Sequence, residues 1–104
     1  MRAVRVRDGR IEVDTVAASP GSGIRVRVRS AGICGSDLHL LESGVLEAAQ
    51  VTIGHEVAGI TDDGTPVAIE PIDPCGSCEP CRSGEDNLCL SGGAMIFGIG
   101  RYGG

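Results

Sequence analysis

Four of the five cysteines in the chain lie close together, within the stretch PCGSCEPCRSGEDNLC at residues 74–89. Two residues separate the first from the second and the second from the third, and seven separate the third from the last. These cysteines are Cys75, Cys78, Cys81 and Cys89. Closely spaced cysteines on tight turns can supply the four soft ligands that a structural zinc ion binds in a tetrahedron. The spacing therefore predicts a zinc lobe over about residues 74–90.

Two disulfide bonds or an iron–sulfur cluster are the alternatives for these four cysteines. Disulfides are rare in the reducing cytoplasm, where we place this chain, and cysteines two residues apart are more often metal ligands. Cys-x2-Cys repeats also occur in iron–sulfur proteins, so this alternative stays open. Zinc is the preferred interpretation, and an iron–sulfur protein would differ from it by absorbing visible light.

The fifth cysteine, Cys34, stands apart in the stretch AGICGSDLHL, and His55 follows in IGHEVAG. A thiol and an imidazole are ligands of catalytic zinc sites, and each lies beside a glycine where the backbone can turn. A single cysteine is more often a small buried apolar residue, however, and a single histidine more often a hydrogen-bonded surface or core residue. These two residues alone leave both interpretations open.

The elements that would position these residues are short strands. The sequence predicts a hairpin over residues 2–14 with its turn at Asp8-Gly9, and it predicts a half-buried strand over 24–30 because Val and Ile alternate there with Arg. Further strands are expected at 51–60, 65–70 and 95–100, with a turn at 62–64. A short helix over 34–44 would begin at Ser36 or Asp37 as its cap and stop at Gly44.

Five or more short strands, 17 glycines and one Phe as the only large apolar aromatic predict a mainly β fold. Such a chain suits a small, partly open β-barrel. Two observations limit the partners. The formal net charge is −5, and no aromatic residues alternate with the arginines of the strand predicted at 24–30. Both observations argue against a nucleic-acid partner. No apolar run is long enough to span a membrane and the first residues lack a signal peptide's apolar stretch, so we expect a cytoplasmic protein without a membrane partner.

The chain contains three motifs in the order VRSAGICGSDLHL, GHEVAG and PIDPCGSCEPCRSGEDNLC. Together they carry a specific resemblance to one protein family. Over about residues 24–104 the chain resembles the N-terminal half of the zinc-dependent medium-chain dehydrogenases, a family of alcohol, polyol and threonine dehydrogenases. The resemblance implies a GroES-like β-barrel with a projecting four-cysteine zinc lobe. It also implies one structural and one catalytic zinc ion, and an alcohol or polyol as the small-molecule substrate.

The resemblance also implies a role for each site residue. Cys34 and His55 would bind the catalytic zinc, and Glu56 could approach it directly. Asp37 would hold the imidazole of His55 in its metal-binding orientation. Ser36 would contact the substrate hydroxyl and His39 would pass the proton towards solvent. The structural zinc ligands would be Cys75, Cys78, Cys81 and Cys89.

The family's nicotinamide cofactor, NAD or NADP, is held by a Rossmann domain, and no Gly-x-Gly-x-x-Gly motif opens a helix here. The family's third protein ligand to the catalytic zinc would also lie beyond Gly104. We therefore expect residues 1–104 to be the GroES-like, catalytic-zinc portion of an oxidoreductase, inactive alone and completed by a Rossmann domain. Apolar strand edges left exposed could make it a homo-oligomer. The alternative is a stand-alone zinc-binding interaction or regulatory module without a redox role.

Overall fold

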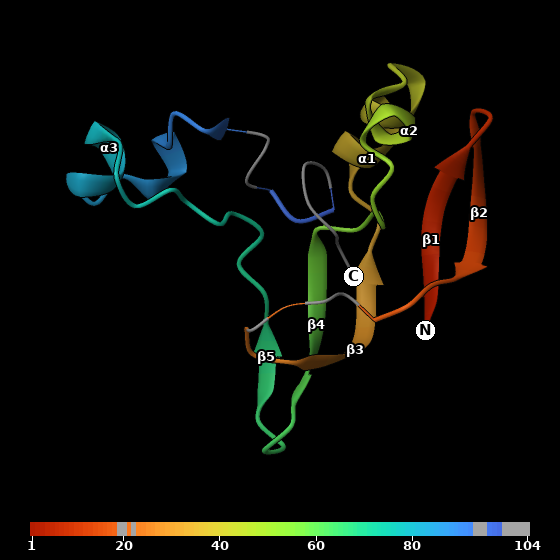
Figure 1. Cartoon of the computed structure of the whole chain (residues 1–104), viewed down its shortest axis with the longest axis horizontal. Coiled ribbons are helices and arrows are strands. Elements are labelled where there is room, and N and C mark those ends of the chain that lie inside the picture. Colours follow the sequence, from red (N-terminus) through yellow and green to blue (C-terminus); the bar gives the residue numbers. More distant parts are fainter. Residues whose placement is uncertain (19–20, 22, 93–95, 99–104) are drawn as a thin grey trace.

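The computed structural model of the chain describes residues 1–18, 21, 23–92 and 96–98. Its strands form two small antiparallel sheets, one of two strands and one of three, with short helices beyond the strand ends (Figure 1). The protein is thus mainly β with partly open sheets, as the glycine-rich, aromatic-poor sequence predicts. Among the described residues, no helix has the length and apolar character that a membrane span requires.

The first sheet is a hairpin of β1 (Arg2–Arg7) and β2 (Arg10–Thr15). Its turn is Asp8-Gly9, as predicted, and both residues have a positive φ, of 50° and 70°. Such a pair is typical of the two-residue turns whose twist matches that of the flanking strands. The carboxylate of Glu47 accepts the N–H of Asp8 (2.8 Å) and of Gly9 (3.1 Å), so the turn is tied to a helix far along the chain.

The second sheet has the order β3-β4-β5, with β3 (Val26–Gly32), β4 (Glu56–Thr61) and β5 (Pro66–Ala68). The prediction of a half-buried strand at 24–30 is wrong in two respects. Ile24 lies outside the strand and is 84% exposed. The register also shifts between Val28 and Ser30, so the alternation is interrupted by a bulge. The predicted strand at 51–60 begins only at Glu56, because the preceding loop instead pairs with β1, where the N–H of Ile53 donates to the carbonyl of Val4 (3.0 Å).

Helix α1 (Gly35–Glu42) follows β3 and differs from the prediction at its start. Its N-cap residue is Cys34 rather than Ser36 or Asp37, and Asp37 occupies the third helical position. The predicted stop is confirmed, since Gly44 has a φ of 78°. That stop leads directly into α2 (Val45–Ala49), which the sequence did not reveal.

The core of the described part is small, and its buried apolar residues come from β1, α2, the loop after α2 and β4. Leu46 of α2 is its most buried side chain, with 1% of its surface exposed. Those of its residues that the structure describes are all aliphatic, in keeping with the aromatic-poor composition. The buried apolar residues are Ala3, Val6, Leu46, Val51 and Val57.

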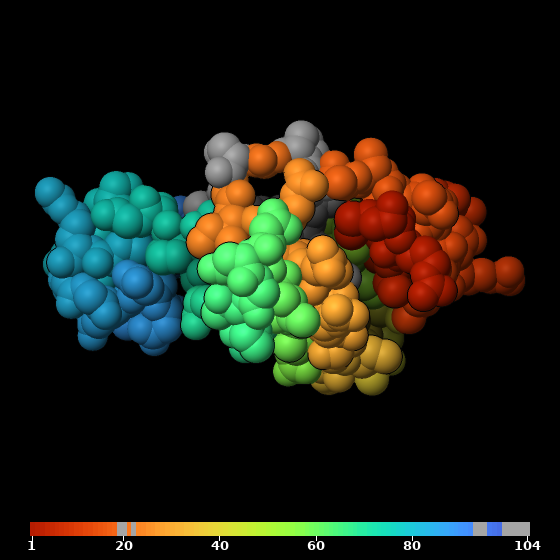
Figure 2. Space-filling model, turned by 90° about the horizontal axis from the view of Figure 1, so that it is seen from below, coloured from red at the N-terminus to blue at the C-terminus, as the bar shows by residue number. Residues whose placement is uncertain are grey.

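The cysteine-rich segment projects from the sheets as a separate lobe, drawn in cyan and blue in Figures 1 and 2. It contains α3 (Glu79–Arg82) and the 3-10 turn η1 (Asp86–Leu88). The two chain ends of the lobe meet at a neck, where Ile72 and Ile96 form an antiparallel bridge and the N–H of Phe97 donates to the carbonyl of Pro71 (2.9 Å). Of the strand predicted at 95–100, only residues 96–98 are described, and they form this bridge and the following turn.

Directly after the neck, Gly98 packs against the backbone of Gly54. A Cβ atom at Gly98 would overlap the carbonyl group of Gly54, and Gly98 has a φ of 79° besides. Both facts restrict the position to glycine. The neck of the lobe is thereby in contact with the residue that precedes His55.

Candidate metal centres

The four cysteines of the lobe converge on one point. Their sulfur atoms all lie within 4.8 Å of one another, and each cysteine is half-buried and not in a disulfide. Short local elements position them, since Cys78 caps the start of α3, Cys81 lies inside it and Cys89 follows η1. Four thiols at this separation form the donor set of a tetrahedral, all-cysteine zinc site. The structure thus brings together all four residues that the spacing predicts as structural metal ligands.

Hydrogen bonds to sulfur lower the pKa of some lobe thiols, and burial raises that of another. The backbone N–H of Ser77, and next that of Cys78 at 3.3 Å, lower the pKa of Cys75 to about 5. The N–H of Cys75 lies 3.4 Å from the sulfur of Cys89 and lowers its pKa. Burial raises the pKa of Cys81 to about 12. Donors directed at sulfur stabilise a thiolate, which is the form that binds a metal.

Ser77 is a contributor that the sequence pattern did not single out. Its hydroxyl donates to the sulfur of Cys75 at 3.6 Å, and its backbone N–H is the largest cause of the lowered pKa. The sequence signal that could have identified Ser77 is its place inside the Cys75-Gly-Ser-Cys78 turn. A turn around a ligand atom directs successive backbone N–H groups towards that atom.

A second cluster consists of Cys34, His55 and Glu56, each with a ligand atom within 4.8 Å of the others. The pairing of β3 with β4 explains why residues so distant in sequence meet. Gly32 lies opposite Glu56 at the end of the ladder, and Cys34 and His55 both lie just beyond that terminal pair. Cys34 and His55 are half-buried, whereas Glu56 is exposed. Thiol, imidazole and carboxylate are all donors that zinc accepts.

Asp37 lies behind this cluster and contacts two of its members. Its side chain is buried, and its Oδ2 atom accepts the backbone N–H of Cys34 at 2.9 Å. Its Oδ1 atom lies 3.2 Å from Nδ1 of His55. Both of these atoms are buried, and neither has a well-aligned hydrogen bond. A small rotation of the ring would direct Nδ1–H at Oδ1, and Nε2 would then keep the lone pair that a metal ion requires. These residues therefore fit a bound zinc ion.

Ser36 faces the same cluster from the first turn of α1. Its hydroxyl lies 3.4 Å from Nε2 of His55. The pKa of Cys34 is lowered by the hydroxyl of Ser36 first, and then by the N–H of Ser36 and by His55. His39 lies one helical turn later and is exposed to solvent. Within the described part of the chain, its side chain makes no hydrogen bond with Ser36 or His55.

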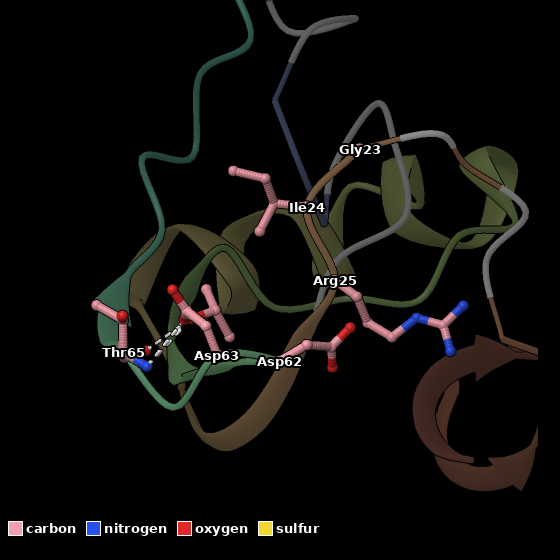
Figure 3. Close-up of a pocket in the computed structure, with 7 residues that line it drawn as sticks. Gly23, Ile24, Arg25, Asp62, Asp63 and Thr65 are labelled. Carbon is pink, nitrogen blue, oxygen red and sulfur yellow. Dashed lines mark hydrogen bonds between the residues drawn. The ribbon is translucent and has the colours of Figure 1, made fainter.

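A hollow in the described surface lies elsewhere, at the opposite end of β4 (Figure 3). There the carboxylate of Asp63 accepts the hydroxyl of Thr61 and the N–H of Thr65, so it serves the β4–β5 turn. The same bonds, that of Thr61 first, lower the pKa of Asp63. The hollow contains none of the predicted site residues. Its lining residues are Gly23, Ile24, Arg25, Thr61, Asp62, Asp63 and Thr65.

Comparison with known proteins gives a family match over most of the chain. Residues 20–104 match the family model of the alcohol dehydrogenase GroES-like domain. A probable zinc-binding alcohol dehydrogenase of Mycobacterium tuberculosis is 38% identical over 100% of this chain and 30% of its own length. L-arabinitol 4-dehydrogenase of Aspergillus oryzae is 43% identical over 67% of this chain and 22% of its own length.

A solved structure also matches the whole fold. An alcohol dehydrogenase of Escherichia coli in complex with NADH superposes with a TM-score of 0.81 at 30% identity, covering 100% of this chain and 34% of that one. The chain thus spans about a third or less of the length of the relatives it matches.

The lobe thiols should react in the order of their pKa values once zinc is removed. In reduced protein stripped of zinc, iodoacetamide at pH 6 should modify Cys75 well before Cys81. A thiol with a pKa of about 5 is largely thiolate at that pH, whereas one with a pKa of about 12 stays protonated. Peptide mass spectrometry of timed samples measures both rates. Zinc-loaded protein is the control, in which all four lobe thiols should be protected, and equal rates for the two cysteines in the stripped protein would contradict this prediction.

Proposed function

The chain belongs to the alcohol dehydrogenase GroES-like domain family, and we propose that it is the zinc-binding, substrate-facing portion of an NAD(P)-dependent alcohol or polyol dehydrogenase. One observation carries the proposal. Cys34, His55 and Glu56 converge at the end of the β3–β4 ladder, with Asp37 behind them in contact with both Cys34 and His55. Names of relatives such as L-arabinitol 4-dehydrogenase support the substrate class.

In this proposal the second cluster is the catalytic centre. Cys34 and His55 would hold a zinc ion, Glu56 could reach it, and the ion would supply Lewis acidity towards a substrate hydroxyl. Ser36, whose hydroxyl is beside Nε2 of His55, would accept the proton of the substrate hydroxyl while passing its own hydroxyl proton on towards His39. His39, exposed one turn further along α1, would release that proton to water. The lobe cysteines would hold a second, structural zinc ion.

Hydride transfer in the complete enzyme would require a nicotinamide dinucleotide held by a Rossmann domain. The NADH complex of the E. coli relative supports this part of the proposal. The described residues contribute two antiparallel sheets and no parallel βαβ unit, which is the unit that binds dinucleotides. The role proposed for these residues is therefore to bind zinc and orient the substrate hydroxyl.

We expect no hydride transfer by these 104 residues alone, because nothing in the described part positions a nicotinamide ring. The measurement is the absorbance of reduced nicotinamide when zinc-loaded chain is mixed with alcohols or polyols and NAD⁺ or NADP⁺. Cofactor reduction that disappears in the Cys34→Ser variant would contradict this expectation.

The purified chain should bind two zinc ions, one at each cluster. Replacing Cys34 by Ser should remove one ion and leave the lobe ion in place, because the two clusters share no ligand. Native mass spectrometry gives the stoichiometry, and elemental analysis for zinc and iron identifies the metal.

Two results would contradict that stoichiometry. A single zinc ion, unaffected by Cys34→Ser, would leave only the lobe occupied and favour a zinc-binding interaction or regulatory module. Iron together with visible absorption would replace zinc by an iron–sulfur cluster in the lobe.

The Asp37→Asn variant should bind the second zinc ion about 10–100-fold more weakly, while the lobe ion stays bound. The amide keeps only one oxygen acceptor, so it cannot accept both the N–H of Cys34 and Nδ1–H of His55. A competition titration with a chromophoric chelator measures both affinities.

Glu42→Gln is the matched control for that variant, because it removes an exposed carboxylate from the same helix. It should bind both ions as the unmodified chain does. Unchanged affinity of the second ion in Asp37→Asn would show that Asp37 does not orient His55.

A further inference from the structure

Gly32 is the last residue of β3 and lies directly opposite Glu56 in the β3–β4 ladder. A Cβ atom built at Gly32 would stand 2.6 Å from Oε2 of Glu56 and 3.2 Å from its Cβ. Its φ is not in the left-handed region, so the backbone conformation does not require glycine here. What glycine provides at this position is space, and the Glu56 carboxylate fills it.

The carboxylate that fills this space is itself a member of the second cluster. Gly32 is two residues before Cys34, and Glu56 directly follows His55. Within the described part of the chain, no hydrogen bond or ion pair fixes the Glu56 carboxylate. Its position over the end of β3, within 4.8 Å of the ligand atoms of Cys34 and His55, therefore depends on what the neighbouring backbone leaves open.

We propose that Gly32 is a positioning residue for Glu56: its missing side chain leaves the space through which the carboxylate reaches the ion held by Cys34 and His55. The inference rests on the proposed zinc site at those residues. A methyl group at position 32 would push the carboxylate away from the ladder end. Rotation of the flexible Glu56 side chain relieves most of the overlap, so the strand itself should tolerate alanine.

The test is a double-mutant cycle on zinc affinity. With the lobe ion already bound, the dissociation constant of the second Zn²⁺ is measured by chelator competition for Gly32→Ala, Glu56→Gln and the double variant. We expect each single variant to bind on the order of tenfold more weakly. The double variant should bind no more weakly than Glu56→Gln alone, because Gly32 acts only through the carboxylate.

Gly35→Ala is the matched control, since a Cβ atom there meets nothing within 4 Å and its φ is also not left-handed. It should bind the second ion as the unmodified chain does. Thermal unfolding followed by circular dichroism separates loss of the ligand from loss of the fold. If Gly32→Ala lowers stability equally in the unmodified chain and in Glu56→Ala, which lacks the side chain that the added Cβ atom would meet, glycine serves the strand rather than the carboxylate, and the proposal is wrong.

Two further results would overturn it. Unchanged affinity in Gly32→Ala, or in Glu56→Gln, removes the premise that the carboxylate reaches the ion through this space. Multiplying losses in the double variant would mean that Gly32 acts independently of Glu56. If the unmodified chain takes up only the lobe ion, the proposed function itself fails, and that is known before any Gly32 variant is measured.

Discussion

The carboxylate of Asp37 is the group on which the arrangement of the second candidate metal centre depends. It is buried, and it accepts the N–H that begins α1 at Cys34 while facing the ring of His55. A buried carboxylate is costly unless such partners satisfy it. The same group therefore fixes where the helix starts and where Cys34 lies, and its other oxygen faces Nδ1 of His55 at 3.2 Å. Helix capping and ligand geometry are one arrangement here, so a change in either would disturb the other.

The two clusters form through different kinds of contact, one local in the sequence and one long-range. The lobe sulfurs are gathered by turns and short helices within one segment, and the N–H groups of those turns stabilise the thiolate of Cys75. The second cluster needs the long-range pairing of β3 with β4 before Cys34 and His55 can meet. Its formation therefore carries the larger loop-closure cost. Ordered sheet is a precondition for the second centre, whereas the lobe can form from local contacts and a metal ion.

This difference explains how much of the structure the sequence predicts. The Asp8-Gly9 hairpin and the lobe cysteines follow from short-range chemistry, and the structure has both. The interruption between Val28 and Ser30 and the late start of β4 arise from pairing between distant segments. Helix α2 is too short for a helical period to show. That Cys34 caps α1 depends on where β3 ends, and the spacing of apolar residues carries no signal for that.

The neck at Ile72 and Ile96 gives the lobe the topology of an insertion. Because its two ends lie side by side at this bridge, the number of residues between them can change without altering the strand register. Lengthening such a loop costs little free energy, since the closure entropy grows only with the logarithm of its length. Selection could thus have expanded, trimmed or exchanged the lobe as a unit. The contact of Gly98 with Gly54 limits such changes in length to the residues before Gly98. Directly after the neck, Gly98 packs against the backbone of the residue that precedes His55.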